Sequence, residues 1–315
     1  MGHPQHTVAI FAPVISLTVT VESPKENGSD EIHFHPGGQG FWVARMLRHL
    51  GERPLICGPI GGESGKVIRG LLPQWGIDLS PIEIDASSAV TIQDRRSGER
   101  EGIADASPPP LDRHSADEFY GAFLDRAISA GTAVIAGQVG GVLQTASYRR
   151  LGHDLASTDV KVVGDLHGAE LSALLEGGPI EILKVSDDDL KDDGWLKDDS
   201  DVARIAALRK LSQAGARNVV LSRGGGPVLA AMDERLFEAQ PPQLEAADFR
   251  GAGDSMTAGL AASLRTGLGP IETLRLACGA GAANVTRHGL GSASDTLFER
   301  LAEQVQVRTI SPTPV

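Results

Sequence analysis

The second half of the chain alternates helix-like segments with short, wholly apolar strand-like segments, and this alternation constrains the fold more than any other feature. Residues 117–129 have a helical pattern and are followed by the apolar run 133–136. The same order recurs with helical segments at 148–155, 169–175 and 202–214 and strand segments at 161–163, 181–183 and 218–221. Strands that are apolar on both faces belong to parallel sheets covered by helices on both sides. We therefore expect an α/β protein, a three-layer αβα sandwich around a central, mostly parallel sheet.

The first third of the chain contains a different pattern, in which apolar and polar residues alternate with a period of two. The pattern occurs at residues 17–21, 31–35, 82–85 and 89–94. Such segments form strands with one face in water, and here they lie between helical units. We predict a small separate sheet built from segments at about 16–36 and 81–104, inserted in a single domain that spans residues 1–315. Residues 309–315 are predicted to be a disordered tail.

Composition excludes several classes of function. The net charge of −12 argues against general nucleic-acid binding. No apolar run reaches the roughly 18 residues of a membrane-spanning helix, and the N-terminus lacks a signal-peptide pattern, so we expect a cytoplasmic protein without membrane contact. The two cysteines, Cys57 and Cys278, match no metal-binding spacing. The stretch 61–66 fails as a P-loop because Ile60 and Val67 occupy two of its required positions.

A glycine turn at residues 248–255 leads directly into an alanine-rich helical run. Gly251, Ala252 and Gly253 allow close approach of the backbone and direct successive N–H groups toward one point. Because a helix begins there, the turn suits a phosphate. Asp254 then has a carboxylate beside an anion site, which fits a base that accepts a proton from a substrate hydroxyl attacking a phosphoryl group. The alternative is an Asp that caps a helix starting at a glycine turn.

A second glycine stretch lies far upstream, at residues 36–51, and it also runs from a glycine turn into an amphipathic helix. The two stretches together resemble the paired signatures of the PfkB (ribokinase-like) carbohydrate kinases. The first signature usually reads G-G-K-G-x-N-x-A-x-x-L-x-x-L-G and the second D-T-x-G-A-G-D. The resemblance extends from about residue 8 to about residue 292. It implies the ribokinase-like fold, in which the small sheet forms a lid over the sugar.

The resemblance also implies a catalytic centre and two cofactors. Asp254 would act as the base, and Gly251, Ala252 and Gly253 would form the anion hole for the transferring phosphoryl group of ATP. The segment that begins at Lys184 occupies the place of the family's K-P-N-x-x-E motif.

Within that segment, Lys184 matches the family and would neutralise a phosphate. Ser186 replaces the family's Asn. Asp189 replaces the Glu that helps to arrange Mg²⁺, which a shorter carboxylate can still do through water.

Four further residues are expected near the nucleotide. Ser222 and Gly224 lie in a strand-then-glycine turn that resembles the family's turn beside ATP. Asn284 lies in a stretch that resembles the helix along the adenine site, although a plain alanine-rich core helix has the same composition. Arg250 replaces a small or hydroxyl residue of the family, and the alternatives are a phosphate contact and a surface arginine.

The acceptor positions depart from the family pattern. The closest branch by sequence is that of the 1-phosphofructokinases and tagatose-6-phosphate kinases, and its sugar-binding Asp is Ser16 here. Gly37 and Gly38 are retained, but Gln39 replaces the Lys that would meet a substrate phosphate. Trp42 replaces the motif's Asn and would either stack on a sugar face or pack the helix. The ATP half of the site therefore matches the family, whereas the acceptor half is altered.

These observations predict an ATP-dependent sugar or sugar-phosphate kinase, most similar to 1-phosphofructokinase, with a homodimer formed through the lid. Two alternatives remain open. One is a kinase for another acceptor, such as a nucleoside or polyol, which the altered acceptor positions permit. The other is a regulator that binds nucleotide or sugar without transferring phosphate.

Overall fold

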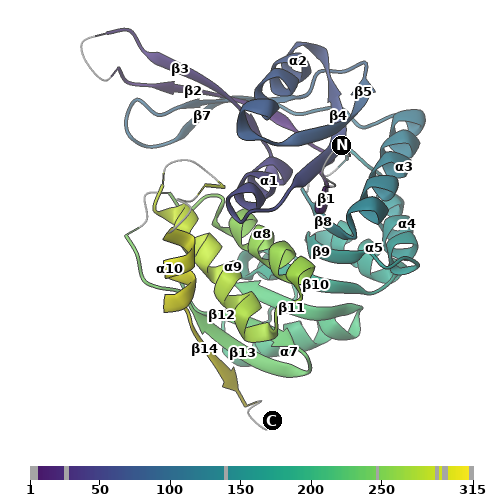
Figure 1. Cartoon of the computed structure of the whole chain (residues 1–315), viewed down its shortest axis with the longest axis vertical. Helices are drawn as coiled ribbons and strands as arrows, with labels where there is room; N and C mark the ends of the chain where they lie inside the picture. The colour runs from purple at the N-terminus through teal and green to yellow at the C-terminus, as the bar shows by residue number, and fades with distance from the viewer. Residues whose placement is uncertain are drawn as a thin grey trace, which may run out of the picture.

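The computed structural model describes residues 6–24, 28–137, 141–245, 248–287, 291–292 and 297–311. Within these ranges the chain forms a ten-stranded sheet flanked by helices and a separate four-stranded sheet (Figure 1). None of the helices in the described ranges has the length and apolar character to cross a membrane.

The large sheet has the strand order β14-β13-β12-β11-β10-β9-β8-β1-β4-β5. Its strands are β1 (Val8–Phe11), β4 (Pro54–Gly61), β5 (Asp78–Ile84), β8 (Thr132–Ala136), β9 (Lys161–Asp165), β10 (Ile180–Ser186), β11 (Ala216–Ser222), β12 (Val228–Met232), β13 (Arg235–Gln240) and β14 (Gln306–Ile310). Neighbours from β5 to β11 are parallel, and β12, β13 and β14 add antiparallel pairs at one edge. The mostly parallel sheet predicted from the apolar strands is confirmed.

Helices cover both faces of this sheet. One layer contains α1 (Gln39–His49), α8 (Ala252–Thr266), α9 (Pro270–Val285) and α10 (Leu297–Gln304), and the other contains α3 (Arg113–Ala130), α4 (Thr145–Ala156), α5 (Gly168–Gly177) and α7 (Asp201–Gln213). Alternate residues of each strand enter two separate cores, as Ile10 and Phe11 of β1 illustrate. The other helices of the described ranges are α2 (Gly62–Leu71), η1 (Leu72–Trp75) and α6 (Asp187–Asp192).

The helix that carries the glycine turn is fixed tightly against its neighbour. A Cβ at Gly259 of α8 would lie only 2.7 Å from the Cα of Ala277 in α9, so the two helices approach more closely than a larger residue would allow. This contact holds the N-terminus of α8 in place relative to the sheet.

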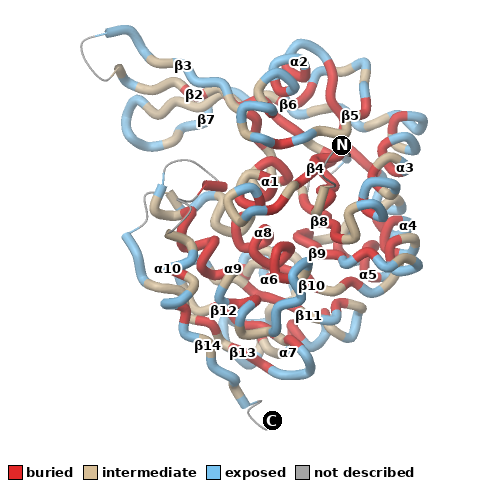
Figure 2. Tube along the Cα trace, in the orientation of Figure 1, coloured by how far each residue is buried: buried red, intermediate tan, exposed pale blue. Residues whose placement is uncertain are grey.

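The small sheet has the order β3-β2-β6-β7 and extends away from the body of the molecule (Figure 1). Its strands are β2 (Ser16–Glu22), β3 (Glu31–Gly37), β6 (Ala89–Asp94) and β7 (Glu101–Ala106). β2 pairs with β3 antiparallel and with β6 parallel. Figure 2 shows that the outer part of β3 and the turn next to β7 are exposed.

Three details of the sequence prediction need correction. Residues 82–85 were assigned to the small sheet, but 82–84 belong to β5, which pairs with β4 at the edge of the large sheet. An edge strand also has a wet face, so it carries the same alternating pattern. β7 was not predicted, because all of its residues are exposed. Residues 309–310 belong to β14 and pair with β13, whereas residues 312–315 lie outside the described ranges.

Candidate active site

The residues of the candidate site gather at the carboxyl ends of the parallel strands. β9 ends at Asp165, β10 ends at Ser186 and β11 ends at Ser222. α8 begins above the same edge with its glycine turn. Ligands of open α/β sheets bind at this edge, because the loops and helix N-termini that follow the strands converge there.

The glycine turn has the geometry that the sequence predicted. Gly251 adopts a left-handed conformation with φ 74°, which residues with a Cβ rarely tolerate, and α8 begins at Ala252. The first-turn N–H groups of Gly253 and Asp254 have no acceptor within the helix. Asp248 stabilises the turn from the other side, since its Oδ1 accepts a hydrogen bond from the Arg250 N–H at 3.0 Å.

Asn284 contacts the turn in a way that the sequence did not predict. Its side chain is fully buried; Nδ2 donates to the carbonyl of Arg250 at 2.7 Å, and Oδ1 accepts from the N–H of Gly291 at 2.7 Å. We expected this amide beside the nucleotide, but both of its polar ends are engaged with the backbone. It therefore holds the loop in front of α8. The side chain of Arg250 itself is exposed.

Two ionisable side chains, Lys184 and Asp165, and the hydroxyl of Thr257 cluster beneath the turn. Lys184 Nζ lies 3.1 Å from Asp165 Oδ1, and both residues are buried. Thr257 of α8 donates from Oγ1 to Asp165 Oδ2 at 2.6 Å. A Cβ at Gly253 would lie 3.0 Å from Lys184 Nζ, so the ammonium group is directly beside the turn. Lys184 is thus held between the end of β9 and the start of α8.

The surroundings shift the proton affinity of Asp254. Burial of its carboxyl, assisted by the negative charge of Asp165, raises the pKa of Asp254 to about 7, while Lys184 and a hydrogen bond from Gln39 act in the opposite direction. The residue as a whole is only partly buried, which leaves the crowded carboxyl accessible. Burial would lower the pKa of Lys184, but attraction to Asp165 and Asp254 prevails and raises it. Asp254 is therefore placed to exchange a proton near neutral pH.

Asp165 was missed in the sequence, although a signal was present. It is the last residue of a buried parallel strand, and acidic residues at the carboxyl ends of such strands lie near ligand sites. Its partners, Lys184 and Thr257, are 19 and 92 residues away, so no local motif connects them.

A polar cavity of about 400 Å³ lies on one side of this cluster and contains three residues predicted to contact the nucleotide. Ser186, Ser222 and Gly224 line it together. Their neighbours in the cavity wall are Asp187, Asp188, Arg204, Arg223, Gly226 and Pro227. The strand-then-glycine turn and the segment after Lys184 therefore face a common space, although they are separated by more than 30 residues in the chain.

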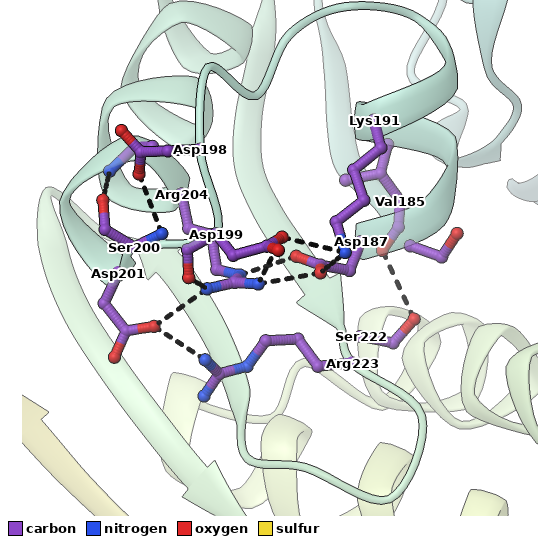
Figure 3. A network of polar contacts seen from close by, with 12 residues as sticks. Val185, Asp187, Lys191, Asp198, Asp199, Ser200, Asp201, Arg204, Ser222 and Arg223 are labelled. Carbon is purple, nitrogen blue, oxygen red and sulfur yellow. Dashed lines mark hydrogen bonds and ion pairs between the residues drawn. The ribbon is translucent and has the colours of Figure 1, made fainter.

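Figure 3 shows the ion-pair network that forms this wall. Arg204 binds Asp187 through two parallel contacts of 2.6 and 2.8 Å, and Arg223 binds Asp201 at 2.7 Å. Asp187, which accepts both contacts from Arg204, is buried. The network fixes α6 and the start of α7 against the turn after β11.

Asp189, the expected metal-associated residue, caps α6. Its Oδ2 accepts hydrogen bonds from the Ser186 N–H at 2.9 Å and from the Ser186 hydroxyl at 2.5 Å. Its Oδ1 lies 3.9 Å from His167 Nε2. Among the described residues no three His, Cys, Asp or Glu side chains are grouped as a metal site. The donor set fits Mg²⁺ only as an ion held mainly by nucleotide phosphates and water, which is the usual arrangement.

The acceptor positions lie where α1 meets the small sheet. A Cβ at Gly37 would lie 2.5 Å from Thr18 Oγ1 and 2.7 Å from Ser16 Oγ, and Gly38 has φ 95°. Neither position accepts a side chain without strain. These glycines direct Gln39, the first residue of α1, to Asp254. Ser16 therefore lies beside the glycine turn that precedes α1, and the first residue of this helix contacts Asp254.

Trp42 is half-buried one turn further along α1. Its ring centroid lies 4.8 Å from that of Phe41 and 5.8 Å from that of His35. The indole therefore packs against the helix and β3 while also lining a cavity.

Comparisons with known proteins identify the family and the fold of this chain. The pfkB family carbohydrate kinase model matches residues 7–297. The 1-phosphofructokinase of Borreliella burgdorferi is 26% identical over 88% of this chain and 89% of its own length. The 1-phosphofructokinase of Vibrio cholerae is 27% identical over 89% and 88%. Phosphofructokinase-2 from Escherichia coli, solved in complex with potassium, is 22% identical, with a TM-score of 0.84 over 96% of this chain and 99% of that one.

The family match covers almost the whole chain, and it includes both glycine turns and the residues gathered at the carboxyl edge of the sheet. Proteins of this family are phosphotransferases that act on a hydroxyl group and use ATP as the phosphate donor. This chain belongs to the pfkB family of carbohydrate kinases.

Proposed function

We propose that this protein transfers the γ-phosphate of ATP to a hydroxyl of a sugar phosphate, in the manner of a 1-phosphofructokinase. The observation that carries this proposal is the position of Asp254, whose carboxyl has a pKa of about 7 at the first turn of α8. A base with this proton affinity can accept a hydroxyl proton at neutral pH, and the adjacent N–H groups can stabilise the charge of the phosphoryl group.

Each part of the centre has a role in this reaction. Asp254 removes the proton of the attacking hydroxyl while the N–H groups of Gly251, Ala252 and Gly253 hold the phosphoryl oxygens. Lys184, kept charged by Asp165 and Asp254, contributes positive charge next to the same turn. Catalysis then consists mainly of positioning and charge stabilisation, as is typical of phosphoryl transfer.

The cavity lined by Ser186, Ser222 and Gly224 receives the nucleotide, and the exposed side chain of Arg250 contacts its phosphates. Mg²⁺, when bound with ATP, neutralises charge on the transferring phosphates. Asp189 would hold the ion through water. Because the reaction consumes ATP, we place the protein in the cytoplasm.

An acceptor panel tests the proposed function. ADP formation would be measured with fructose 1-phosphate, fructose 6-phosphate, tagatose 6-phosphate, free sugars, polyols and nucleosides, each with ATP and Mg²⁺. We expect turnover with a sugar phosphate and a bisphosphate product detectable by ³¹P NMR. Turnover only with a neutral acceptor would assign another substrate class, which the replacements at Gln39 and Trp42 would explain. ATP binding without turnover would favour a regulator.

We also propose a homodimer formed through the small sheet. Ile32 and Phe34 of β3 are 56% and 53% exposed and point to the same face, since they are two residues apart. Val21 and Val19 of β2 are paired with them and extend this apolar face. Exposed apolar residues on a sheet that stands away from the body are typical of an interface.

Glu substitutions at Ile32 and Phe34 are expected to convert the dimer to a monomer, because each would place a carboxylate in an apolar contact. Analytical ultracentrifugation at several protein concentrations measures the change. Ile128→Glu is the matched control, since Ile128 is 54% exposed on α3. A dimer that persists in the double variant, or a wild-type protein that is monomeric throughout, would refute this assembly.

A further inference from the structure

A second polar cavity, of about 390 Å³, lies between the small sheet and α1, and none of the nucleotide positions line it. Its walls come from β2, β3, α1, η1 and the turn between β6 and β7. Three arginines, two histidines and two tryptophans contribute to it: Arg45, Arg95, Arg100, His33, His35, Trp42 and Trp75. Trp42 is the only one of these seven that the sequence motifs singled out as an acceptor position.

The cavity concentrates positive charge in a chain whose net charge is −12. Arg95 lies 3.7 Å from Glu22, and Arg100 lies 3.2 Å from Asp248. Glu22 is the only carboxylate among the lining residues, and Asp248 contacts Arg100 from outside the lining, so the three guanidinium groups outnumber these two carboxylates. Gathering like charges in a partly buried space is unfavourable unless an anion shares it.

Two of the arginines are partly buried in ways that bear on ligand binding. Burial, with a contribution from Arg287, lowers the pKa of Arg45 to about 10, so the group is still charged at neutral pH. Its guanidinium lies 4.2 Å from the Trp75 ring centroid, which orients it by a cation–π contact. The Nε of Arg100 is buried and has no hydrogen-bond acceptor among the described residues. A bound oxyanion would supply one.

The cavity is connected to the catalytic centre along α1. Gln39, Trp42 and Arg45 are spaced by three residues and follow one ridge of the helix. Gln39 hydrogen-bonds to Asp254, and Arg45 is displaced from it by about 9 Å along the helix axis. A phosphorylated sugar can bridge that interval. Arg100 makes the second connection, because Asp248 binds both it and the backbone of the glycine turn.

We propose that this cavity binds the phosphate group of the acceptor, with Arg45, Arg95 and Arg100 as its ligands. The inference rests on the proposed function, which places the reacting hydroxyl at Asp254. Guanidinium groups suit a phosphate because they donate paired hydrogen bonds to its oxygens. The cavity thereby supplies the positive charge that Gln39 lacks, from Arg45 within the upstream glycine stretch and from Arg95 and Arg100 outside both stretches. A phosphate monoester on the acceptor is the ligand chemistry that it selects.

Intrinsic tryptophan fluorescence tests the binding without any turnover. Trp42 and Trp75 line the cavity, and they are two of the three tryptophans in the chain. Inorganic phosphate and fructose 1-phosphate would be titrated separately into the full-length protein without ATP. We expect saturable changes that Arg45→Gln and Arg95→Gln each weaken about tenfold or more, the loss typical of one charge-assisted hydrogen bond.

Two control variants each remove an arginine that is close in sequence to a cavity arginine but does not line the cavity. Arg48→Gln lies one turn beyond Arg45 on α1. Arg96→Gln is next to Arg95 in the chain, but its guanidinium pairs with Asp94 and Asp30 at the surface. We expect both variants to bind phosphate with an affinity within about twofold of that of the wild-type protein, because exposed charges contribute little.

Kinetics distinguish the acceptor from other sources of phosphate. Arg45→Gln and Arg95→Gln should raise KM for the phosphorylated acceptor, with kcat nearly unchanged, and inorganic phosphate should compete with that acceptor. Wild-type affinity in both variants, or inhibition by phosphate that does not compete with the acceptor, would overturn the assignment. Phosphate binding in a protein that turns over no acceptor would instead reject the proposed function and leave the anion site standing.

Discussion

Replacing Asp254 with Asn is expected to lower kcat by roughly 10²–10⁴-fold, the contribution of a positioned general base. The substitution keeps the shape of the side chain and its contact with Gln39 but removes the ability to accept a proton. The KM for ATP should change little, because the first-turn N–H groups of α8 are retained. ADP release at saturating ATP and acceptor measures the effect.

The same variant makes a prediction about stability. The pKa of Asp254 is raised from its ordinary value of 3.8 to about 7 in the folded protein, so ionisation of this group opposes folding as pH rises from about 4 to about 7. Asn cannot ionise. We expect Asp254→Asn to raise the melting temperature at pH 8 and to raise it less at pH 5. Asp192→Asn, an exposed change on α6, is the control. Near-wild-type turnover in Asp254→Asn would show that another group is the base.

Lys184→Met is expected to destabilise the fold by about 3–5 kcal/mol, the cost of removing one partner of a buried ion pair. The substitution leaves Asp165 and Asp254 without their shared cation, and Lys184 and Asp165 are only 8% and 6% exposed. It should also raise the pKa of Asp254, since Lys184 lowers it. Urea unfolding measures the first effect, and the pH dependence of any residual activity measures the second.

Two further variants test whether the loss of stability in Lys184→Met comes from breaking the buried ion pair. Lys191→Met removes a lysine that is 43% exposed, and Asp187 keeps its two contacts with Arg204, so the change should cost less than about 1 kcal/mol. Adding Asp165→Leu to Lys184→Met should recover part of the lost stability, because no unpaired charge then remains at that position. If Lys184→Met were as stable as wild type, the buried ion pair would not hold the site together.

The fold was predictable from sequence where local pattern and burial coincide. Apolar strands that alternate with helices have one stable arrangement, a parallel sheet covered on both faces, and that prediction was correct. Residues 82–84 were assigned to the wrong sheet, because an edge strand of the large sheet and a strand of the small sheet show the same alternation of apolar and polar residues. β7 gave no signal, since a fully exposed strand has no apolar face.

The residues of the candidate site could likewise be predicted only where they lie in one continuous motif. Residues in continuous motifs, such as Gly251 and Asp254, could be proposed from the sequence because each motif carries its own turn and helix start. Asp165, Thr257 and Arg100 were not, because they meet the motifs only after folding brings separate strands and helices together. The cavity proposed for the nucleotide is lined by segments that are distant in the chain and that the sequence analysis treated separately.

The pH dependence of kcat/KM tests the central claim most directly, because it reports the proton affinity of the base in the free enzyme. With a sugar-phosphate acceptor, activity should rise with an apparent pKa of about 7, the value for Asp254, and level off above it. The acceptor phosphate titrates near pH 6, so the residual activity of Asp254→Asn provides the reference and should lack the step at about 7. A wild-type profile without that step, or the same step in both proteins, would contradict the assignment of Asp254 as the base.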